Sequence, residues 1–397
     1  MTRQRPGVAD VFRRYGASFA QSHGKSASSA QRKVLRDIIC CRTAALGGHK
    51  QKCDRCGHEQ ISYNSCRNRH CPQCQAAARA RWLEAREQDL LDVAYFHVVF
   101  TLPAEIAPLA LQNKRAIYGI LFRAVATTLQ TIARDPKHLG ADIGFLAVLH
   151  TWGQNLHHHP HLHCVIPGGG VSLDGLHWIP CRQGFFLPVK VLSRMFRGKF
   201  LSYLQRAFER GDLGFHGQLA ALADSQAWRR WLTPLHAKAW VVYAKPPFGG
   251  PRQVLRYLAR YTHRVAISDQ RILSVGDGQV TFRWKDYARG QAKARMTLGA
   301  TEFIRRFLFH VLPKGFVHIR HYGFLANRDR ARKVATVKQF LQQATAMPCT
   351  APPSEFPAEP PPGSDFHCCP RCHQGHLVDV AKIEAQPWSS TFLFNTS

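Results

Sequence analysis

The sequence predicts an α+β protein whose main domain is built around an antiparallel sheet. Runs rich in β-forming residues alternate with helical stretches at irregular spacing, and some runs lie close enough together to form hairpins. Two groups of metal-binding side chains, one of cysteines and one of histidines, interrupt this pattern. The 397 residues, 45% of them hydrophobic, are enough for two or three modules that each bury a core.

Three regions are expected from the changes of composition along the chain. Residues 1–90 are helical and basic at first and then rich in cysteine, which indicates a small metal-stapled module. Residues 91–340 contain the expected strands and form the main domain. Residues 341–397 include the proline-rich stretch Pro348–Pro362 and a further cysteine cluster, and we expect this tail to be partly disordered.

The first expected strand starts at Tyr95 and is ended by Pro103. Further strands are expected at residues 144–150, 161–166, 237–243, 264–268, 271–275 and 279–285. Helices are expected at about residues 104–134, 189–221 and 252–261.

The charge of the chain is strongly unbalanced. Lysine and arginine total 54 against 25 acidic residues, a formal net charge of +29. Such an excess repels itself unless a polyanion neutralises it, so nucleic acid is the expected partner.

Cysteine usage and hydropathy bear on the compartment. No apolar run approaches the ~20 residues of a membrane span, and residues 1–22 lack the apolar stretch of a signal peptide, so we expect a cytoplasmic protein without a membrane partner. The cytosol keeps thiols reduced, and the 13 cysteines are therefore interpreted as metal ligands where they cluster.

Two CxxC motifs, separated by 14 residues, stand in the N-terminal region. They contain Cys53, Cys56, Cys71 and Cys74. Two such turns can present four thiolates to one ion, so these residues are expected to bind a structural Zn²⁺.

Other residues of the same loops are candidates for further roles. His49, Cys66 and His70 are alternative zinc ligands, or ligands of a second ion. Arg67 and Arg69 are expected to grip DNA phosphates, although the module could also serve only to brace the next domain.

The densest group of histidines lies between residues 157 and 163. If residues 161–166 form a strand, His161 and His163 emerge on one face while Leu162 points into the core. Two imidazoles side by side form half of a metal site.

Two tyrosines, Tyr257 and Tyr261, lie four residues apart. Pro251 lies early in the expected helix, so the spacing places both phenol groups on one helix face, one turn apart. They are candidate nucleophiles, whereas paired aromatic residues at this spacing also occur as ordinary packing positions.

Several of these motifs are similar to those of a known family. The run His161-Leu162-His163 matches the histidine-hydrophobic-histidine signature of HUH endonucleases. With the runs at residues 65–72, 257–265 and 321–328, in this order, the chain resembles a two-tyrosine transposase of the IS91 type over about residues 10–335.

The resemblance implies a fold and a metal site. The expected domain at residues 91–340 is an HUH domain with a ferredoxin-like or RRM-like antiparallel sheet, preceded by a zinc-binding, DNA-binding module at residues 1–90. It implies that His161 and His163 hold Mg²⁺ or Mn²⁺, with Gln154 or its rival His159 as third ligand, and that Zn²⁺ is confined to the cysteines.

The resemblance also implies a reaction. Tyr257 and Tyr261 would nick and rejoin single-stranded DNA at transposon ends through 5′-phosphotyrosine intermediates, and insert the strand into target DNA by a rolling-circle route. Arg256, Arg260 and Arg264 would contact the phosphates of the strand.

Other functions remain open at this stage. A plasmid-type rolling-circle replication initiator shares the histidine and tyrosine motifs. A zinc-containing DNA-binding regulator or transposase relic would lack catalysis, and a nuclease using water as nucleophile would not need the tyrosines.

Overall fold

The computed structural model describes residues 6–245, 266–286, 292–344 and 368–386. The chain divides into two compact units. Unit 1 consists of residues 1–78, 263–311 and 352–397, and unit 2 of residues 79–262 and 312–351. These units differ from the expected regions 1–90, 91–340 and 341–397, because the chain passes between the units four times.

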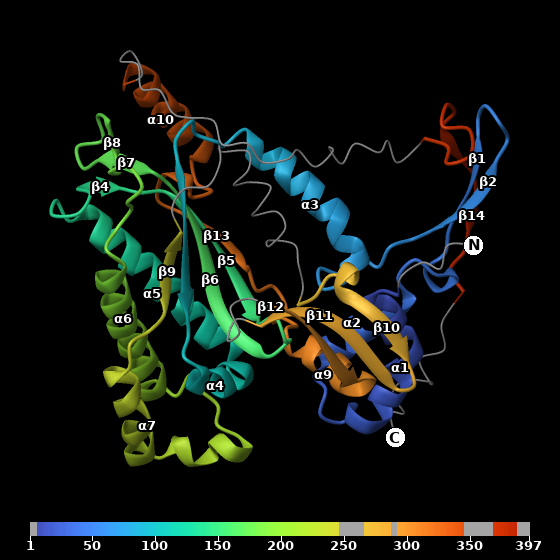
Figure 1. The fold of residues 1–397 in the computed structure, drawn as a ribbon, viewed down its shortest axis with the longest axis horizontal. Helices are drawn as coiled ribbons and strands as arrows, with labels where there is room; N and C mark the ends of the chain where they lie inside the picture. The colour runs from blue at the N-terminus through green and yellow to red at the C-terminus, as the bar shows by residue number, and fades with distance from the viewer. Residues whose placement is uncertain (1–5, 246–265, 287–291, 345–367, 387–397) are drawn as a thin grey trace. The chain divides into compact units, whose positions relative to one another are not determined.

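Unit 2 is built on a five-stranded antiparallel sheet of strand order β13-β5-β6-β3-β9 (Figure 1). Its strands are β3 (Tyr95–Thr101), β5 (Phe145–Trp152), β6 (His158–Pro167), β9 (Val242–Lys245) and β13 (Ile319–Tyr322). The predicted mixture of helices and antiparallel strands is thus confirmed, with β6 as the central strand.

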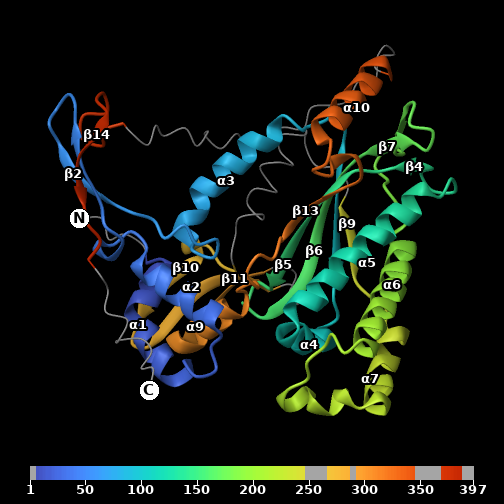
Figure 2. The same ribbon diagram turned by 180° about the vertical axis from the view of Figure 1, so that it is seen from behind.

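Helices from unit 2 cover one face of this sheet. They include α4 (Ala107–Gln112), α5 (Lys114–Arg134), α6 (Val189–Glu209) and α7 (Ser225–Ala237). Figures 1 and 2 show α5 and α6 side by side along the sheet. Helix α5 is long and apolar enough to cross a membrane, but its apolar residues are buried in the core of the unit, as in the central helix of a soluble fold.

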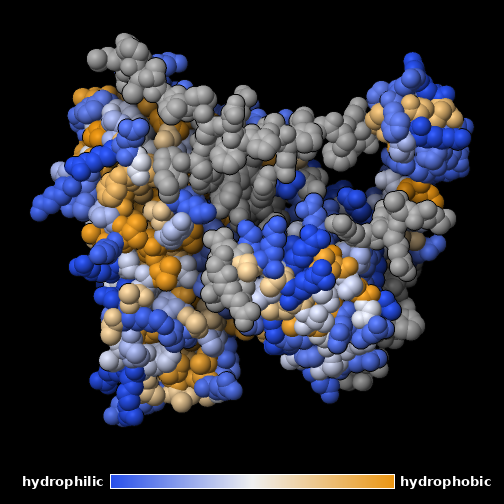
Figure 3. All heavy atoms as spheres, in the orientation of Figure 1, coloured by the Kyte–Doolittle hydropathy of each residue, from blue (hydrophilic) through white to orange (hydrophobic). Residues whose placement is uncertain are grey.

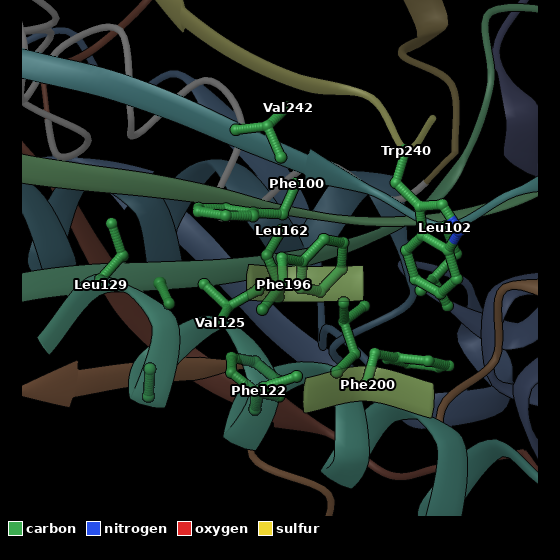
Figure 4. Packing of buried hydrophobic residues seen from close by; sticks show 14 of the residues in the cluster. Phe100, Leu102, Phe122, Val125, Leu129, Leu162, Phe196, Phe200, Trp240 and Val242 are labelled. Atoms are coloured by element: carbon green, nitrogen blue, oxygen red, sulfur yellow. The ribbon is translucent and has the colours of Figure 1, made fainter. Parts of the chain in front are cut away.

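The alternation of side chains along β6 separates two environments. Leu162 and Cys164 point into the core beneath the helices, and Leu162 lies near Phe100 and Phe196 in Figure 4. His161, His163 and Val165 point to the opposite face. The expected strand therefore has the predicted orientation, although it starts three residues earlier.

A second layer of unit 2 lies at one end of the sheet. It consists of β4 (Ala141–Asp142), β7 (Gly169–Ser172) and β8 (Trp178–Pro180), with α10 (Arg330–Ala344) packed on β8. A turn at Gly323 connects β13 to this region, where φ is +60° and a Cβ would meet the carbonyl oxygen of Ile143 at 1.8 Å. Only glycine fits this close approach of backbones.

Unit 1 contains a helical core and a sheet. Helices α1 (Val8–His23), α2 (Ser29–Cys40) and α9 (Ala300–Phe309) pack together, and the rings of Phe12 and Phe307 meet edge to face at 5.1 Å. The hydroxyl of Ser28 caps α2 by accepting a hydrogen bond from the backbone N–H of Gln31. The sheet consists of β10 (Ile272–Gly276), β11 (Gln279–Asp286) and β12 (Ala292–Gly299).

A smaller sheet in unit 1 combines both ends of the chain. Its strands are β1 (Gly48–Cys53), β2 (Glu59–Tyr63) and β14 (Leu377–Ile383), in the order β14-β1-β2. Within the tail that was expected to be partly disordered, residues 377–383 form β14, which pairs along the whole of β1. Helix α3 (Pro72–Glu87) begins in unit 1 and ends in unit 2.

Other sequence predictions need correction. In the range 237–243, where a strand was expected, Ala237 ends α7 and the strand β9 starts only at Val242. Helix α7 extends this far because Trp228, Leu232 and Leu235 repeat at helical spacing and are buried. The helix expected at residues 104–134 is divided into a 3₁₀ turn (Ala104–Ile106), α4 and α5. Residues 266–268 form no strand, and residues 252–261 lie outside the described residues.

The fold predicts a specific cost for Leu162→Ala. Leu162 is fully buried, so its truncation leaves a cavity and should lower the free energy of unfolding by about 2–5 kcal/mol, measured by denaturant titration. Leu176→Ala is the control: Leu176 is 71% exposed, and its loss should change stability by less than about 0.5 kcal/mol. Equal effects of the two changes would contradict the described orientation of β6.

Candidate functional site

Three histidines meet on the face of the unit 2 sheet that points away from α5 and α6. The register of β5 and β6 pairs His150 directly with His161, and places His163 opposite Val148, two residues along the strand. One ring nitrogen from each of His150, His161 and His163 lies within 4.8 Å of the others. Neighbouring strands thus bring the three imidazoles together at one point.

Hydrogen bonds fix the orientation of two of these rings. Nδ1 of His161 donates to the carbonyl oxygen of His159 at 2.7 Å, because a carbonyl can only accept. Nδ1 of His163 lies 2.8 Å from Nε2 of His97 on β3, and the two rings are parallel. Neighbouring groups usually orient metal-binding histidines in this way.

The surroundings keep these imidazoles uncharged. Burial lowers the pKa of His161 to about 4, with a smaller contribution from His159. Burial also lowers the pKa of His163 well below its usual range, and the nearby His150 acts in the same direction. Neutral imidazoles at pH 7 keep the lone pairs that a metal ion requires.

The donor set fits a divalent metal ion. Three ring nitrogens from adjacent strands lie close enough together to hold one ion. Imidazole suits Mn²⁺ better than Mg²⁺, which prefers oxygen ligands.

The third histidine was not among the residues that the sequence singled out. Gln154 lies in the turn between β5 and β6, and His159 lies on β6 with its ring centroid 5.4 Å from that of His161. His150 completes the group instead. It stood at the end of an expected strand, but only the register with β6 shows that it faces His161.

A first cysteine cluster lies in the N-terminal part of unit 1. It consists of Cys41, Cys66, Cys71 and Cys74. The Sγ atoms of Cys41 and Cys66 each lie 3.6 Å from that of Cys74. Sulfurs that surround Zn²⁺ tetrahedrally at about 2.3 Å are roughly 3.8 Å apart, so this spacing matches a zinc site.

A second cluster consists of Cys53, Cys56, Cys369 and Cys372. The single site predicted from Cys53, Cys56, Cys71 and Cys74 is therefore wrong in its grouping, because each CxxC motif finds its partners elsewhere in the sequence. The alternative ligand Cys66 belongs to the first cluster, together with Cys41, which the sequence analysis missed. The only feature of the sequence that indicated Cys41 was its position next to Cys40, at the end of an amphipathic helix.

The other candidates of the zinc-binding loops have different roles. His70 is buried outside both clusters, and its Nδ1 lies 3.2 Å from Oδ1 of Asn68. Asn68 in turn donates to a carboxylate oxygen of Asp37 at 2.7 Å, so these residues brace the loop. His49, the remaining alternative, forms an ion pair with Asp379 at 3.2 Å.

The candidate DNA-binding arginines are only partly within the described structure. Arg67 is exposed, with a positive φ of 52°, and Arg69 is half-buried, with a pKa that burial lowers. The candidate nucleophiles and the remaining arginines lie outside the described residues: Tyr257, Tyr261, Arg256, Arg260 and Arg264.

Comparisons with known proteins match both units. A family model described as "Transposase zinc-binding domain" matches residues 11–102, and one described as "Putative transposase" matches residues 144–333. The chain is 57% identical over 383 residues to "Putative transposase y4qJ" of Sinorhizobium fredii, covering 96% of each chain.

A more distant relative carries a more specific name. The chain is 29% identical over 319 residues to "Transposase for insertion sequence element IS801" of Pseudomonas savastanoi pv. phaseolicola, covering 80% of this chain and 75% of the relative. No solved structure matches the chain.

The histidine-bearing face of the sheet predicts a dependence of stability on pH. Burial, together with the cations of Arg330 and Arg86, lowers the pKa of His321 on β13 to about 4. Between about pH 6.5 and pH 4 the unfolded chain binds a proton at this residue that the folded chain does not, so stability falls as the pH falls through this range.

In His321→Gln, the free energy of unfolding should therefore fall less steeply between pH 6.5 and pH 4 than in wild type. The slope against pH should be smaller by up to the contribution of one proton. Denaturant titrations at several pH values measure this slope. A slope in His321→Gln equal to that of the wild type would show that the half-buried position of His321 does not lower its pKa.

Proposed function

Because the chain belongs to the IS91-type transposases with an N-terminal zinc-binding domain, we propose that it cuts and rejoins single-stranded DNA at transposon ends by an HUH mechanism. Membership of this family implies DNA transposition. The main support for the mechanism is the group of three histidines, two of them on the central strand of an antiparallel sheet. Rolling-circle transfer of one strand into target DNA is part of the same proposal.

The arrangement of unit 2 supports an HUH fold. The pattern His161-Leu162-His163 lies on β6, with Leu162 in the core and the histidines on the opposite face of the sheet. Helices α5 and α6 cover the face that carries Leu162, so the hydrophobic core and the histidine group lie on different sides of the sheet.

We assign His150, His161 and His163 as ligands of Mn²⁺ or Mg²⁺, in place of the set that included Gln154. Such an ion, when bound, withdraws charge from the scissile phosphate and orients it. Contacts with His97 and with the carbonyl of His159 hold the rings of His163 and His161 in place.

The proposed nucleophiles are Tyr257 and Tyr261, whose spacing of four residues supports their presentation on one helix face. The phenol gives up its proton to solvent as its oxygen forms a bond to phosphorus. The bond from phosphorus to the 3′ oxygen breaks, and the 3′ oxygen takes up a proton from solvent, so no net proton is gained or lost. The 5′-phosphotyrosine retains the energy of the bond, so rejoining needs no nucleotide cofactor. Two tyrosines allow two successive cleavages.

The zinc-binding domain is the proposed anchor on DNA. The first cysteine cluster forms the rigid centre of loops that carry Arg67 and Arg69. Arg256 directly precedes Tyr257, Arg260 lies between the two tyrosines, and Arg264 follows Tyr261. These three arginines are proposed to contact the phosphates of the cleaved strand.

Formation of a covalent adduct tests the tyrosine mechanism. The protein is incubated with Mn²⁺ and a labelled single-stranded oligonucleotide that carries the element's end, and products are separated on denaturing gels. A protein-DNA adduct should form with wild type and be lost in the double variant Tyr257→Phe and Tyr261→Phe, whereas Tyr63→Phe, on β2 of the other unit, should retain it. Single variants identify the tyrosine that acts first.

Other outcomes would support other functions. Cleavage without an adduct would indicate a nuclease that uses water, and binding without cleavage a DNA-binding regulator or transposase relic. Cleavage only at a plasmid replication origin would indicate a replication initiator.

The ligand set predicts unequal effects of two substitutions on metal binding. His150→Ala removes one of three ring nitrogens and should weaken Mn²⁺ binding by at least about 10-fold, measured by calorimetric titration of the zinc-loaded protein. Gln154→Ala should change the affinity by less than about 3-fold. The reverse order would identify Gln154 as the third ligand and exclude His150.

A further inference from the structure

We propose that the C-terminal segment completes a second zinc site of the N-terminal module. Cys369 and Cys372 would bind one Zn²⁺ together with Cys53 and Cys56. The match to the zinc-binding domain of the family ends at residue 102, so half of this ligand set lies outside that domain. The inference does not depend on the proposed DNA chemistry.

The distances between the sulfurs fit one ion held by four thiolates. The Sγ atoms of Cys56 and Cys369 are 3.6 Å apart, and those of Cys53 and Cys372 are 3.7 Å apart. These values match the edges of roughly 3.8 Å expected for tetrahedral Zn²⁺ and are far longer than the S–S bond of a disulfide, about 2.05 Å. All four sulfurs lie within 4.8 Å of one another.

Both CxxC turns have the backbone geometry that supports thiolates. The N–H of Cys56 donates to Sγ of Cys53 at 3.4 Å in the N-terminal turn. In the C-terminal turn, the N–H of Arg371 donates to Sγ of Cys369 at 3.4 Å, and that of Gly375 donates to Sγ of Cys372 at 3.3 Å. Hydrogen bonds to sulfur favour its charged form, which is the form that binds Zn²⁺ while the thiol protons pass to solvent.

The chain directly after the C-terminal turn is held against the N-terminal one. Asp54 donates its backbone N–H to the carbonyl of His376 at 3.1 Å and accepts from the N–H of His376 at 2.8 Å. Gly375 approaches so closely that a Cβ would lie 2.5 Å from Sγ of Cys53. Strand β14 then follows β1 in antiparallel register from Cys53 opposite Leu377.

Hydrophobic burial alone cannot account for this closure. The buried cluster at the junction consists of Cys53, Cys369 and Leu377, with Cys372 packed against it, so three of its four members are proposed ligands. Val378 and Val380 of β14 are each more than half exposed. Figure 3 shows the small sheet as a mixture of apolar and polar surface. A structural metal ion is the usual substitute where so little apolar surface is buried.

The ligands identify the metal by its chemistry. Four thiolates in tetrahedral arrangement select Zn²⁺ over Mg²⁺ and Mn²⁺, which prefer oxygen. The four sulfurs fill the tetrahedron, so the site has no open position for a substrate and its role is structural. Its effect is to tie residues 368–386 to β1 and β2.

The zinc content of the full chain, purified with a phosphine reductant, tests the proposal. The double variant Cys369→Ser and Cys372→Ser should contain one zinc ion per chain less than wild type, measured by atomic emission. Cys368→Ser is the matched control, because Cys368 is adjacent to Cys369 but lies outside the cluster, and it should retain the full content. Removing Cys41 and Cys74 as well should release a second ion.

Hydrogen exchange provides a second measurement if the variant is unstable. In the double variant, amides of β1 and β14 should exchange at least about 10-fold faster than in wild type, while those of α5 stay protected. Unchanged zinc content, or unchanged protection of β1, would overturn the proposal. A disulfide between Cys56 and Cys369 in the reduced wild-type protein, detected by mass spectrometry, would also overturn it.

Discussion

The alternation of side chains along the central strand β6 is the constraint on which unit 2 depends. Leu162 and Cys164 must be buried beneath the helices, and this fixes His161 and His163 on the opposite face. A shift of one residue would bury the histidines in the hydrophobic core and expose Leu162. The same contacts that stabilise the sheet therefore orient the candidate metal site. His150 on the neighbouring strand β5 completes this site, and His97 on β3 holds the ring of His163.

Unit 1 is organised by a different interaction. Its helices α1, α2 and α9 share an ordinary apolar core. The loops around the two cysteine clusters bury few apolar side chains, and thiolate groups take the place of a core there. The two clusters also differ in where their ligands come from: one lies within residues 41–74, and the other joins residues more than 300 positions apart.

The sequence was sufficient for features that depend on local spacing. The strand at His161, the opposite orientation of Leu162, and the CxxC turns at Cys53 and Cys71 follow from periods of two residues and from short motifs. Features that depend on pairing between distant segments were missed or grouped wrongly. Nothing in the local sequence indicates that Cys53 pairs with Cys372, or that His150 faces His161, because both depend on the register of strands brought together by folding.

The position of Cys369 and Cys372 near the end of the chain has a consequence during synthesis. Cys369 follows Cys56 by 313 residues, and at ~5–20 residues per second the ribosome needs about 15–60 s to deliver it. Throughout this time β1 can pair with β2 but not with β14, and the thiols of Cys53 and Cys56 lack the two cysteines that complete their cluster. Premature termination anywhere before residue 369 leaves them without partners. Completion of this cluster and of the sheet around β1 therefore depends on residues that are translated more than 300 positions later.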